Sequence, residues 1–446
     1  MRPKLHFTPI KNWMNDPNGF IYFKGYYHLF YQHFPYDVKW GTMHWGHKIS
    51  KDFIHWEDKG IALYPSKDFD RNGCFSGSAI EVNNKMYLYY TAVVYTKLNP
   101  DNIHVSGDSF LASQAMFISE DGIHFDSNTK RVVIPTFDKD DKIGHWHNTR
   151  DPKVWKEDDT YYMVIGSQYA DGKKMKGQIL IYTSNDALNW QYKNRLINPT
   201  IDSHMWECPD IFKINDKRIL IMSPEDTLKD GINYPSHASW SFIDFNKDTC
   251  ESHMTSELQY LDYGLDLYAP TSTIDEYGNR VVVAWLRMSE AVDNEWIGMF
   301  TLPRVVTIKN NHVCFHVHPH VDKLFKDEVD SFTNIEPLKI SVDLKEGSYL
   351  NIGGYQITYE DGCVHTNREK VFTDVSKLFN KKSNIGKKFS TPLLKNGNHI
   401  DIYVDANVIE IYINNGEYVL TNIVYGMNDD FEYNDIENLK MYKADV

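Results

Sequence analysis

The stretch SKDFIHW, residues 50–56, returns twice further along the chain with the same pattern. SEDGIHF occupies residues 119–125 and SNDALNW residues 184–190, so Ser-x-Asp-x-x-x-aromatic recurs at spacings of 69 and 65 residues. An acid in a turn, followed by a buried aromatic side chain, suits the link between two strands. Repeats of this length predict one small sheet per repeat, as in a β-propeller, rather than a helical solenoid.

A second set of segments has a similar period. Runs rich in aromatic and β-branched residues, which favour strands, follow a turn residue at intervals of roughly sixty residues. They are GYYHLFYQ from Gly25, NKMYLYYTA from Asn84, DTYYMVIGS from Asp159, KRILIMSPE from Lys217 and NRVVVAWLR from Asn279. Five repeats over about 310 residues predict a five-bladed β-propeller; a β-sandwich would space its turns more evenly.

The sequence pattern changes from about Val321. Residues 399–425 alternate apolar and polar side chains between short turns, which predicts an antiparallel meander with one buried and one wet face. We therefore expect an all-β protein with a propeller at residues 1–315, a linker or short helix at 316–332 and a β-sandwich at 333–446.

Composition excludes several classes of protein. The formal net charge of −14 argues against nucleic acid or an anionic membrane as a partner. No apolar run is long enough for a membrane span, and MRPKLHFTPI at the start lacks the apolar segment of a signal peptide. Five cysteines without a CxxC pair indicate reduced thiols, so we expect a cytoplasmic protein.

Three histidines at alternate positions, His316, His318 and His320, could in principle bind zinc from one face of a strand. No cysteine or carboxylate ligand set accompanies them, so a surface strand is the better interpretation. His145 and His147 are expected at a substrate entrance rather than at a metal. We expect neither a metal nor an organic cofactor.

Three acidic motifs fall in three different repeats: NDPNG with Asp16, RDPKV with Asp151 and WECPD with Glu207. The inner strands of a propeller converge on its axis, so acids from separate repeats can meet there. Proline restricts the preceding residue to extended conformations, which would orient Asp16 and Asp151. Glu207 lies between Trp206 and Cys208, and burial would raise its pKa as a general acid requires. A carboxylate in a polar turn and a protonated one form the working pair for glycoside cleavage.

The motifs WMNDPNG, FSGS, RDPKV, WECPD and DYGLDLYA resemble, in order and spacing, those of glycoside hydrolase family 32. This family contains invertases, fructan hydrolases and sucrose-6-phosphate hydrolases. The resemblance covers the whole chain and includes the C-terminal segment VIEIYINNGEYVLT. It implies a five-bladed propeller with a β-sandwich and a retaining fructosidase mechanism.

The resemblance also implies roles for individual residues. Asp16 would be the nucleophile that attacks C2 of a β-fructofuranosyl unit, Glu207 the acid/base and Asp151 the transition-state stabiliser. A retaining pair implies carboxyl groups about 5–5.5 Å apart for Asp16 and Glu207. Arg150 would hold sugar hydroxyls and keep Asp151 ionised, and Asp266 would tune Glu207 or bind at the rim. The other expected substrate-binding residues are Asn15, Gln32, Trp40, Phe75, Ser76, Tyr268 and Trp285, of which Trp40 and Trp285 could equally be core residues.

The expected activity is a cytoplasmic β-fructofuranosidase acting on a small sugar, sucrose or sucrose 6-phosphate. Arg287, Lys39 and His44 are candidates for a phosphate contact, and rim ion pairs would explain each equally well. The alternatives are an exo-acting fructan or kestose hydrolase, an arabinan-cleaving propeller and a sugar-binding propeller without activity. The intact acid set argues against the last. The sequence leaves the substrate preference and the oligomeric state open.

Overall fold

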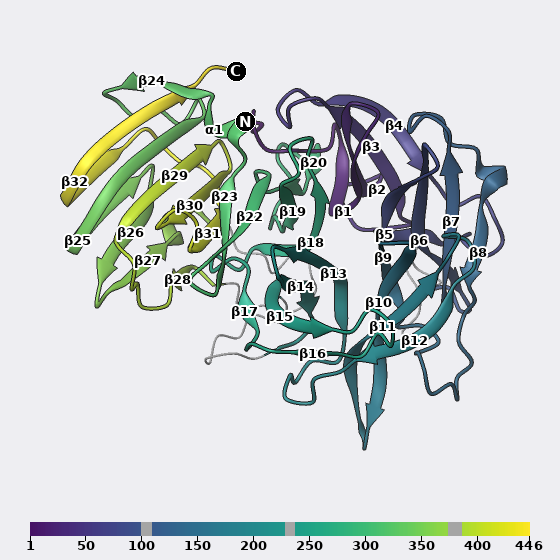
Figure 1. The fold of residues 1–446 in the computed structure, drawn as a ribbon. Coiled ribbons are helices and arrows are strands. Elements are labelled where there is room, and N and C mark those ends of the chain that lie inside the picture. Colours follow the sequence, from purple (N-terminus) through teal and green to yellow (C-terminus); the bar gives the residue numbers. More distant parts are fainter. Residues whose placement is uncertain (100–108, 228–236, 373–385) are drawn as a thin grey trace.

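The chain folds into two β-units that lie side by side (Figure 1). The structure is a computed structural model and describes residues 1–99, 109–227, 237–372 and 386–446. The first unit consists of five antiparallel sheets arranged around an axis, and the second is a β-sandwich built from one continuous nine-stranded sheet. The all-β class, the five-bladed propeller and the C-terminal sandwich are therefore confirmed.

Each blade begins with the strand nearest the axis, here named the inner strand, and continues outward along the chain. In blade one, β20 (Trp296–Ile297) adds to the inner strand in parallel, so a late segment joins the first sheet. The first three blades contain β1 (Asn12–Phe23), β2 (Tyr26–Phe34), β3 (His44–Ser50) and β4 (Glu57–Leu63); β5 (Gly73–Val82), β6 (Lys85–Tyr95), β7 (Phe110–Ser119) and β8 (Arg131–Ile134); and β9 (Arg150–Glu157), β10 (Thr160–Asp171), β11 (Lys174–Ser184) and β12 (Gln191–Leu196).

Blades four and five follow the same plan with extra short strands at their outer edges. Their strands are β13 (Trp206–Ile214), β14 (Lys217–Pro224), β15 (Ser239–Phe245), β16 (Ser252–Met254) and β17 (Gln259–Tyr260), then β18 (Leu267–Ile274), β19 (Arg280–Leu286), β21 (Met299–Phe300), β22 (Arg304–Lys309) and β23 (His312–Val317). The five aromatic and β-branched runs predicted as strands form the second strand of each blade, namely β2, β6, β10, β14 and β19.

The repeated Ser-x-Asp motif ends the third strand of the first three blades. In blade one, the Asp52 carboxylate accepts the backbone N–H groups of Ile54 and His55, both at 2.9 Å. Asp121 and Asp186 do the same in blades two and three. In blade four the same turn is made by the Asn246 side chain, a substitution that hid this repeat in the sequence. The aromatic residue that follows is only partly buried, because it caps a core cluster rather than entering it.

The C-terminal sheet folds over because β25 (Leu338–Ile352) serves both layers. Its first half pairs with β29 and its second half with β26, and the register with β32 shifts between Leu344 and Tyr349. The remaining strands are β24 (Phe325–Val329), β26 (Tyr355–Glu360), β27 (Cys363–Asn367), β28 (Lys388–Ser390), β29 (His399–Asp405), β30 (Val408–Ile413), β31 (Tyr418–Ile423) and β32 (Phe431–Ala444).

Between the two units the chain forms the helix α1 (Pro319–Asp322), followed by β24, which pairs with β32 of the sandwich. The expectation that three histidines share one face of a strand is wrong. Strand β23 ends at Val317, His318 is buried as the N-cap of α1, and its Nε2 lies 3.1 Å from Asp275 Oδ2. The other short helices among the described residues are 3-10 turns, η1 (Ser127–Thr129) and η2 (Glu369–Val371). Among the described residues, no helix is long and apolar enough to cross a membrane.

The interface between the two units is buried and charged. Every residue of β30 is buried, which corrects the predicted wet face of the meander. The reason is that one face of β30 packs in the sandwich core and the other against the propeller. There Arg304, on β22, donates to Glu410 Oε2 at 2.9 Å and to Asp262 Oδ2 at 3.0 Å, with no exposed surface on any of the three side chains.

Replacing Arg304 with methionine is expected to lower the free energy of unfolding by about 3–5 kcal/mol, because two buried carboxylates would lose their cation. Urea unfolding of both proteins measures the change. The matched control is Lys345→Met, which removes a surface ion pair with Asp435 whose side chains are about half exposed. It should cost roughly 0–1 kcal/mol. Equal losses for the two variants would contradict the structural importance of this interface.

Candidate active site

All five inner strands carry a bulge at the same end of the axis. In each blade, two residues of the inner strand lie opposite a single residue of the second strand. Such bulges re-aim side chains and are frequent beside active sites. The bulged pairs are Asn15 and Asp16, Phe75 and Ser76, Asp151 and Pro152, Cys208 and Pro209, and Ala269 and Pro270.

The bulges impose unusual backbone conformations. Asp151, Cys208 and Ala269 all have positive φ, at 68°, 49° and 49°. The expectation that proline would hold Asp151 extended is therefore wrong, because the bulge overrides the preference of a residue that precedes proline. In blade two, Gly77 directly follows the bulge, as Pro17 does in blade one, and a Cβ atom there would lie 1.9 Å from the carbonyl oxygen of Tyr89.

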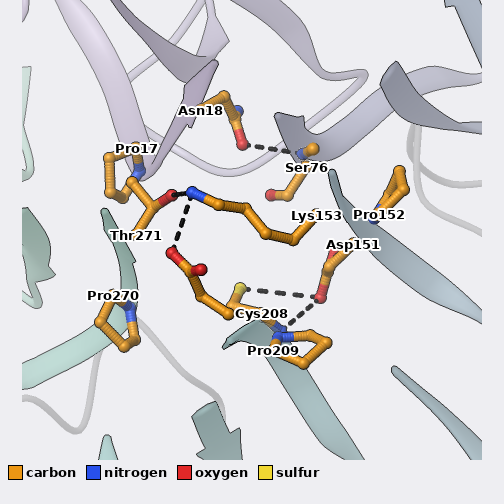
Figure 2. A pocket seen from close by; sticks show the side chains of 12 residues that line it. Pro17, Asn18, Ser76, Asp151, Pro152, Lys153, Cys208, Pro209, Pro270 and Thr271 are labelled. Carbon is orange, nitrogen blue, oxygen red and sulfur yellow. Dashed lines mark hydrogen bonds and ion pairs between the residues drawn. The ribbon is translucent and has the colours of Figure 1, made fainter. Parts of the chain in front are cut away.

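Four of the bulges bring their polar side chains together, and Figure 2 shows three of these side chains, Ser76, Asp151 and Cys208. Asp16 Oδ2 accepts a hydrogen bond from Ser76 Oγ at 2.6 Å, and Asp16 Oδ1 accepts one from Asn15 Nδ2 at 3.0 Å. The Cys208 thiol lies 3.8 Å from Asp16 Oδ2 and 3.6 Å from Asp151 Oδ2. Burial raises the pKa of Asp16, while the hydrogen bonds from Ser76 and Asn15 oppose the rise.

Asp151 is buried and is held by hydrogen bonds to residues of the two neighbouring blades. Its Oδ2 accepts the backbone N–H of Cys208 at 2.9 Å, and its own N–H donates to Thr91 Oγ1 at 3.0 Å. Burial raises the pKa of Asp151 to about 6, against the positive charge of Arg150 and together with the negative charge of Asp16. Asp16 and Asp151 therefore share one site, with the Cys208 thiol between them.

Glu207 lies within a network of charged groups. Its Oε1 accepts a hydrogen bond from Arg150 Nε at 2.8 Å, and its Oε2 accepts one from the Tyr268 hydroxyl. Burial raises the pKa of Glu207 well above its usual value, and the negative charge of Glu225 raises it further, while Arg150 opposes both. The predicted rise is thus confirmed in direction, and the protonated carboxyl is the form that a general acid needs.

Glu225 is a site residue that sequence reasoning missed. Its carboxylate pairs with Arg150 Nη2 at 3.2 Å and with His204 Nε2 at 2.8 Å. Burial disfavours its charge, but the hydrogen bond to His204 and the charge of Arg150 lower the pKa of Glu225 to about 2. Glu225 ends the run KRILIMSPE, and the proline before it is typical of an ordinary turn. The signal that could have identified Glu225 is its place directly after the second strand of a blade, a position that recurs with the period of the blades.

The aromatic residues expected at the pocket contact other aromatic side chains. Trp40 and Phe75 meet edge to face with ring centres 5.8 Å apart, and Trp285 is packed between Trp13 and Tyr268 at 6.1 Å and 6.5 Å. Gln32, opposite the first bulge, is buried and donates to the carbonyl oxygen of Cys74 at 3.0 Å.

Several expected contacts differ in the structure. Arg150 pairs with Glu207 and Glu225, and it reaches Asp151 by charge alone rather than by a hydrogen bond. Asp266 is buried in an ion pair with Arg368 of the sandwich, so it supports the interface between the units instead of the pocket rim. Cys208 lies against Asp16 and Asp151 rather than shielding Glu207.

The candidates for a phosphate contact also have structural partners. The Arg287 guanidinium covers the Tyr268 ring and donates to the carbonyl oxygen of Leu265 at 2.6 Å. His44 Nδ1 lies 2.9 Å from the carbonyl oxygen of Thr42, whereas Lys39 is exposed. His145 and His147 lie just before the inner strand of blade three, and His147 is buried. Within the described ranges, no group of three or more histidine, cysteine or acidic side chains is arranged to hold a metal ion.

Comparison with known families identifies the family of this chain. Residues 6–319 match the glycosyl hydrolases family 32 N-terminal domain, and residues 336–444 match the glycosyl hydrolases family 32 C-terminal domain. The chain belongs to this family. It is therefore a glycoside hydrolase, and the resemblance inferred from the five motifs is confirmed.

Individual members of family 32 align along nearly the whole chain. Sucrose-6-phosphate hydrolase of Bacillus subtilis (strain 168) is 30% identical over 443 residues, which cover 94% of this chain and 88% of the relative. Among solved structures, a mutant of the Bombyx mori β-fructofuranosidase BmSUC1 in complex with sucrose superposes with a TM-score of 0.79 at 27% identity, covering 99% of this chain and 93% of the other. Sucrose-6-phosphate hydrolase from Lactobacillus gasseri shares the fold, with a TM-score of 0.85 at 24% identity and coverages of 100% and 93%.

Proposed function

We propose that this family 32 enzyme is a β-fructofuranosidase that hydrolyses sucrose and sucrose 6-phosphate with retention of configuration at fructose C2. The observation that supports it most is the difference between two acids at one end of the axis. At Asp16, hydrogen bonds from two neutral donors oppose the burial that raises its pKa, whereas burial and the ionised Glu225 together raise the pKa of Glu207 well above its usual value. Two carboxyl groups with different protonation states are what glycoside cleavage requires.

In the proposed reaction, Asp16 attacks C2 of the fructosyl unit while Glu207 gives its proton to the departing glucosyl oxygen. A covalent fructosyl–Asp16 ester results. Glu207, now ionised, then takes a proton from water as the water attacks C2, which releases fructose and restores Asp16. Retention by this route requires Asp16 and Glu207 carboxyl groups about 5–5.5 Å apart.

Asp151 would hold the sugar hydroxyls as positive charge develops at C2, and the N–H of Cys208 fixes its carboxylate in place. Tyr268 and Arg150 hold the two oxygens of Glu207, so the acid cannot rotate away from the leaving group. The aromatic side chains of Trp40, Phe75 and Trp285 would wall the pocket against the apolar faces of the sugar.

The relatives support this substrate class. The Bacillus subtilis relative bears the name of a sucrose-6-phosphate hydrolase, and the silkworm relative was solved with sucrose. A side-by-side measurement of kcat/KM on sucrose, sucrose 6-phosphate, kestose and inulin tests the proposal and ranks the substrates. Turnover on none of them would contradict it. Following the first-formed anomer of fructose by NMR tests retention, since an inverting enzyme would release the opposite anomer.

We also propose a cytoplasmic location, where imported and phosphorylated sucrose would arrive. Support comes from the cysteines, all five of which are free thiols, as is usual in a reducing compartment. Fractionation of the producing cells with an antibody against the protein tests this location.

Glu225→Gln is expected to move the alkaline limb of the pH–rate profile to lower pH by about one unit. The direction of this shift follows from the negative charge of Glu225. Glu225 is ionised because its pKa is about 2, and its negative charge raises the pKa of Glu207. Without that charge, Glu207 loses its proton at lower pH and stops acting as an acid sooner.

The measurement is kcat/KM on sucrose across pH. Asp226→Asn serves as the control, since Asp226 is the next residue, half-exposed and 3.4 Å from His204. An unmoved alkaline limb in Glu225→Gln would show that Glu225 does not set the pKa of the acid.

A further inference from the structure

The axis of the propeller opens at its other end into a funnel, away from the three carboxylates. The inner strands all run from the bulges toward this end, and their later residues line the funnel, which has a volume of about 510 Å³. That volume is within the range of small-molecule sites. Residues from all five inner strands contribute, including Tyr22, Glu81, Trp155, Phe212 and Ile274.

A buried ion pair lies between the funnel and the active site, and Figure 2 shows its lysine, Lys153, reaching toward Thr271. Lys153, two residues after Asp151, crosses the axis and places its Nζ 2.9 Å from Asp210 Oδ2 and 2.6 Å from the carbonyl oxygen of Ser272. Asp210 in turn accepts the N–H and the hydroxyl of Ser272, at 2.9 Å and 2.7 Å. Lys153 and Asp210 therefore neutralise one another, and the two ends of the axis are separate sites.

Arg280, on the second strand of blade five, adds a positive charge to the floor of the funnel. Its guanidinium covers the Phe212 ring at 5.0 Å, and its Nη1 donates to Ser272 Oγ at 3.3 Å. In the described part of the chain Arg280 makes no ion pair within 4.0 Å, and its buried Nε lacks a hydrogen-bond partner. A guanidinium stays charged even when buried, and Asp210, the carboxylate that attracts Arg280, is already paired with Lys153, so a further negative partner would stabilise Arg280.

The lining of the funnel has a net positive charge, although the formal net charge of the protein is −14. Its lining contains five cationic and three acidic side chains. Arg218 is neutralised by both oxygens of Glu157, at 3.0 Å and 2.8 Å, while Lys156 and Lys213 are exposed. The positive excess therefore comes from Arg280 on the floor and from the lysines.

We propose that this funnel is a second binding site, for an organic phosphate, in which Arg280 pairs with the phosphate group. Arginine offers the paired donors that phosphate oxygens favour. Lys156 and Lys213 attract the anion from solvent, and the aromatic and aliphatic walls, with Tyr22 and Ile274, accommodate an organic body such as a sugar ring. The volume beyond the phosphate favours a phosphorylated sugar over the bare ion.

Calorimetric titration of the full chain in phosphate-free buffer tests the proposal, with glucose 6-phosphate, inorganic phosphate and glucose as probes. Glucose 6-phosphate is expected to bind, and Arg280→Gln should weaken it about tenfold or more, because a charge-assisted contact is lost. Arg280→Lys, which keeps the charge without the paired donors, should lie between the two. Arg195→Gln, the same charge change on an outer strand of blade three, should leave the affinity unchanged.

Equal affinity of wild type and Arg280→Gln for glucose 6-phosphate would overturn the proposal, because the sugar phosphate would then be bound elsewhere, such as in the active site. Inorganic phosphate binding as tightly as glucose 6-phosphate would overturn the organic ligand and leave the ion as the occupant. Glucose binding that is equally sensitive to Arg280→Gln would overturn the role of the phosphate. Thermal unfolding checks folding: glucose 6-phosphate should raise the midpoint of wild type and of Arg280→Lys more than that of Arg280→Gln.

Discussion

Replacing Asp16 with asparagine is expected to lower kcat on sucrose by about four orders of magnitude, because an amide cannot form the fructosyl ester. The change is nearly isosteric, and the side chain can still accept a hydrogen bond from Ser76, so the fold should persist. The thermal unfolding midpoint of the variant should therefore stay close to that of wild type, or rise, since a buried carboxylate is removed.

Initial rates of fructose release at saturating sucrose measure this loss. Asp68→Asn makes the same chemical change at an exposed position and should leave kcat unaltered. A variant that folds and keeps more than about one tenth of the wild-type kcat would remove Asp16 from the role of nucleophile, since loss of such a group is never that mild.

Replacing Glu207 with alanine is expected to lower kcat/KM on sucrose by about 10³-fold, in line with the loss of a general acid. A fructoside with an activated aryl leaving group departs without a proton and should lose far less in its first step. Its ester would then accumulate, because the same residue activates water for the second step. A burst of aryl alcohol followed by slow turnover is the expected time course.

Stopped-flow measurement of the released aryl alcohol separates the two steps. Added azide should speed the second step in Glu207→Ala, because a small anion can enter the space left by the carboxyl group and attack without a general base. Comparable losses on sucrose and on the activated fructoside would contradict the acid/base assignment. Glu207→Gln, which preserves side-chain volume, should show the same discrimination between substrates but a weaker response to azide.

The sequence predicted the fold well because the propeller repeats itself. The second strands are apolar on both faces and recur at one period, and the Ser-x-Asp turns mark the third strands. Where a different residue makes the same turn, as Asn246 does in blade four, the sequence pattern does not reveal the repeat. The alternating pattern predicts one solvent-facing side for strand β30, because alternation cannot reveal that a second unit covers that side.

The sequence predicted the acidic residues of the site better than it predicted the contacts that these residues make. Asp16, Asp151 and Glu207 stand in short motifs, but their partners come from other blades. Glu225 could not be paired with Glu207 from sequence, since the pairing depends on the register of two strands. The left-handed backbone of Asp151 depends on a bulge, and a bulge is a property of two strands rather than of one motif.

Because every inner strand carries a bulge at the same end of the axis, new functional groups could arise in any blade by substitution of a bulge residue. In each blade one bulge residue directly precedes a proline or glycine: Asp16, Ser76, Asp151, Cys208 and Ala269. These five positions carry five different side chains, and at three of them, Asp151, Cys208 and Ala269, φ is positive. Ala269 holds only a methyl group there, in the same left-handed backbone as Asp151. Substitution of Ala269 alone would therefore place a new functional group on the inner strand of blade five, with the backbone conformation that Asp151 has in blade three.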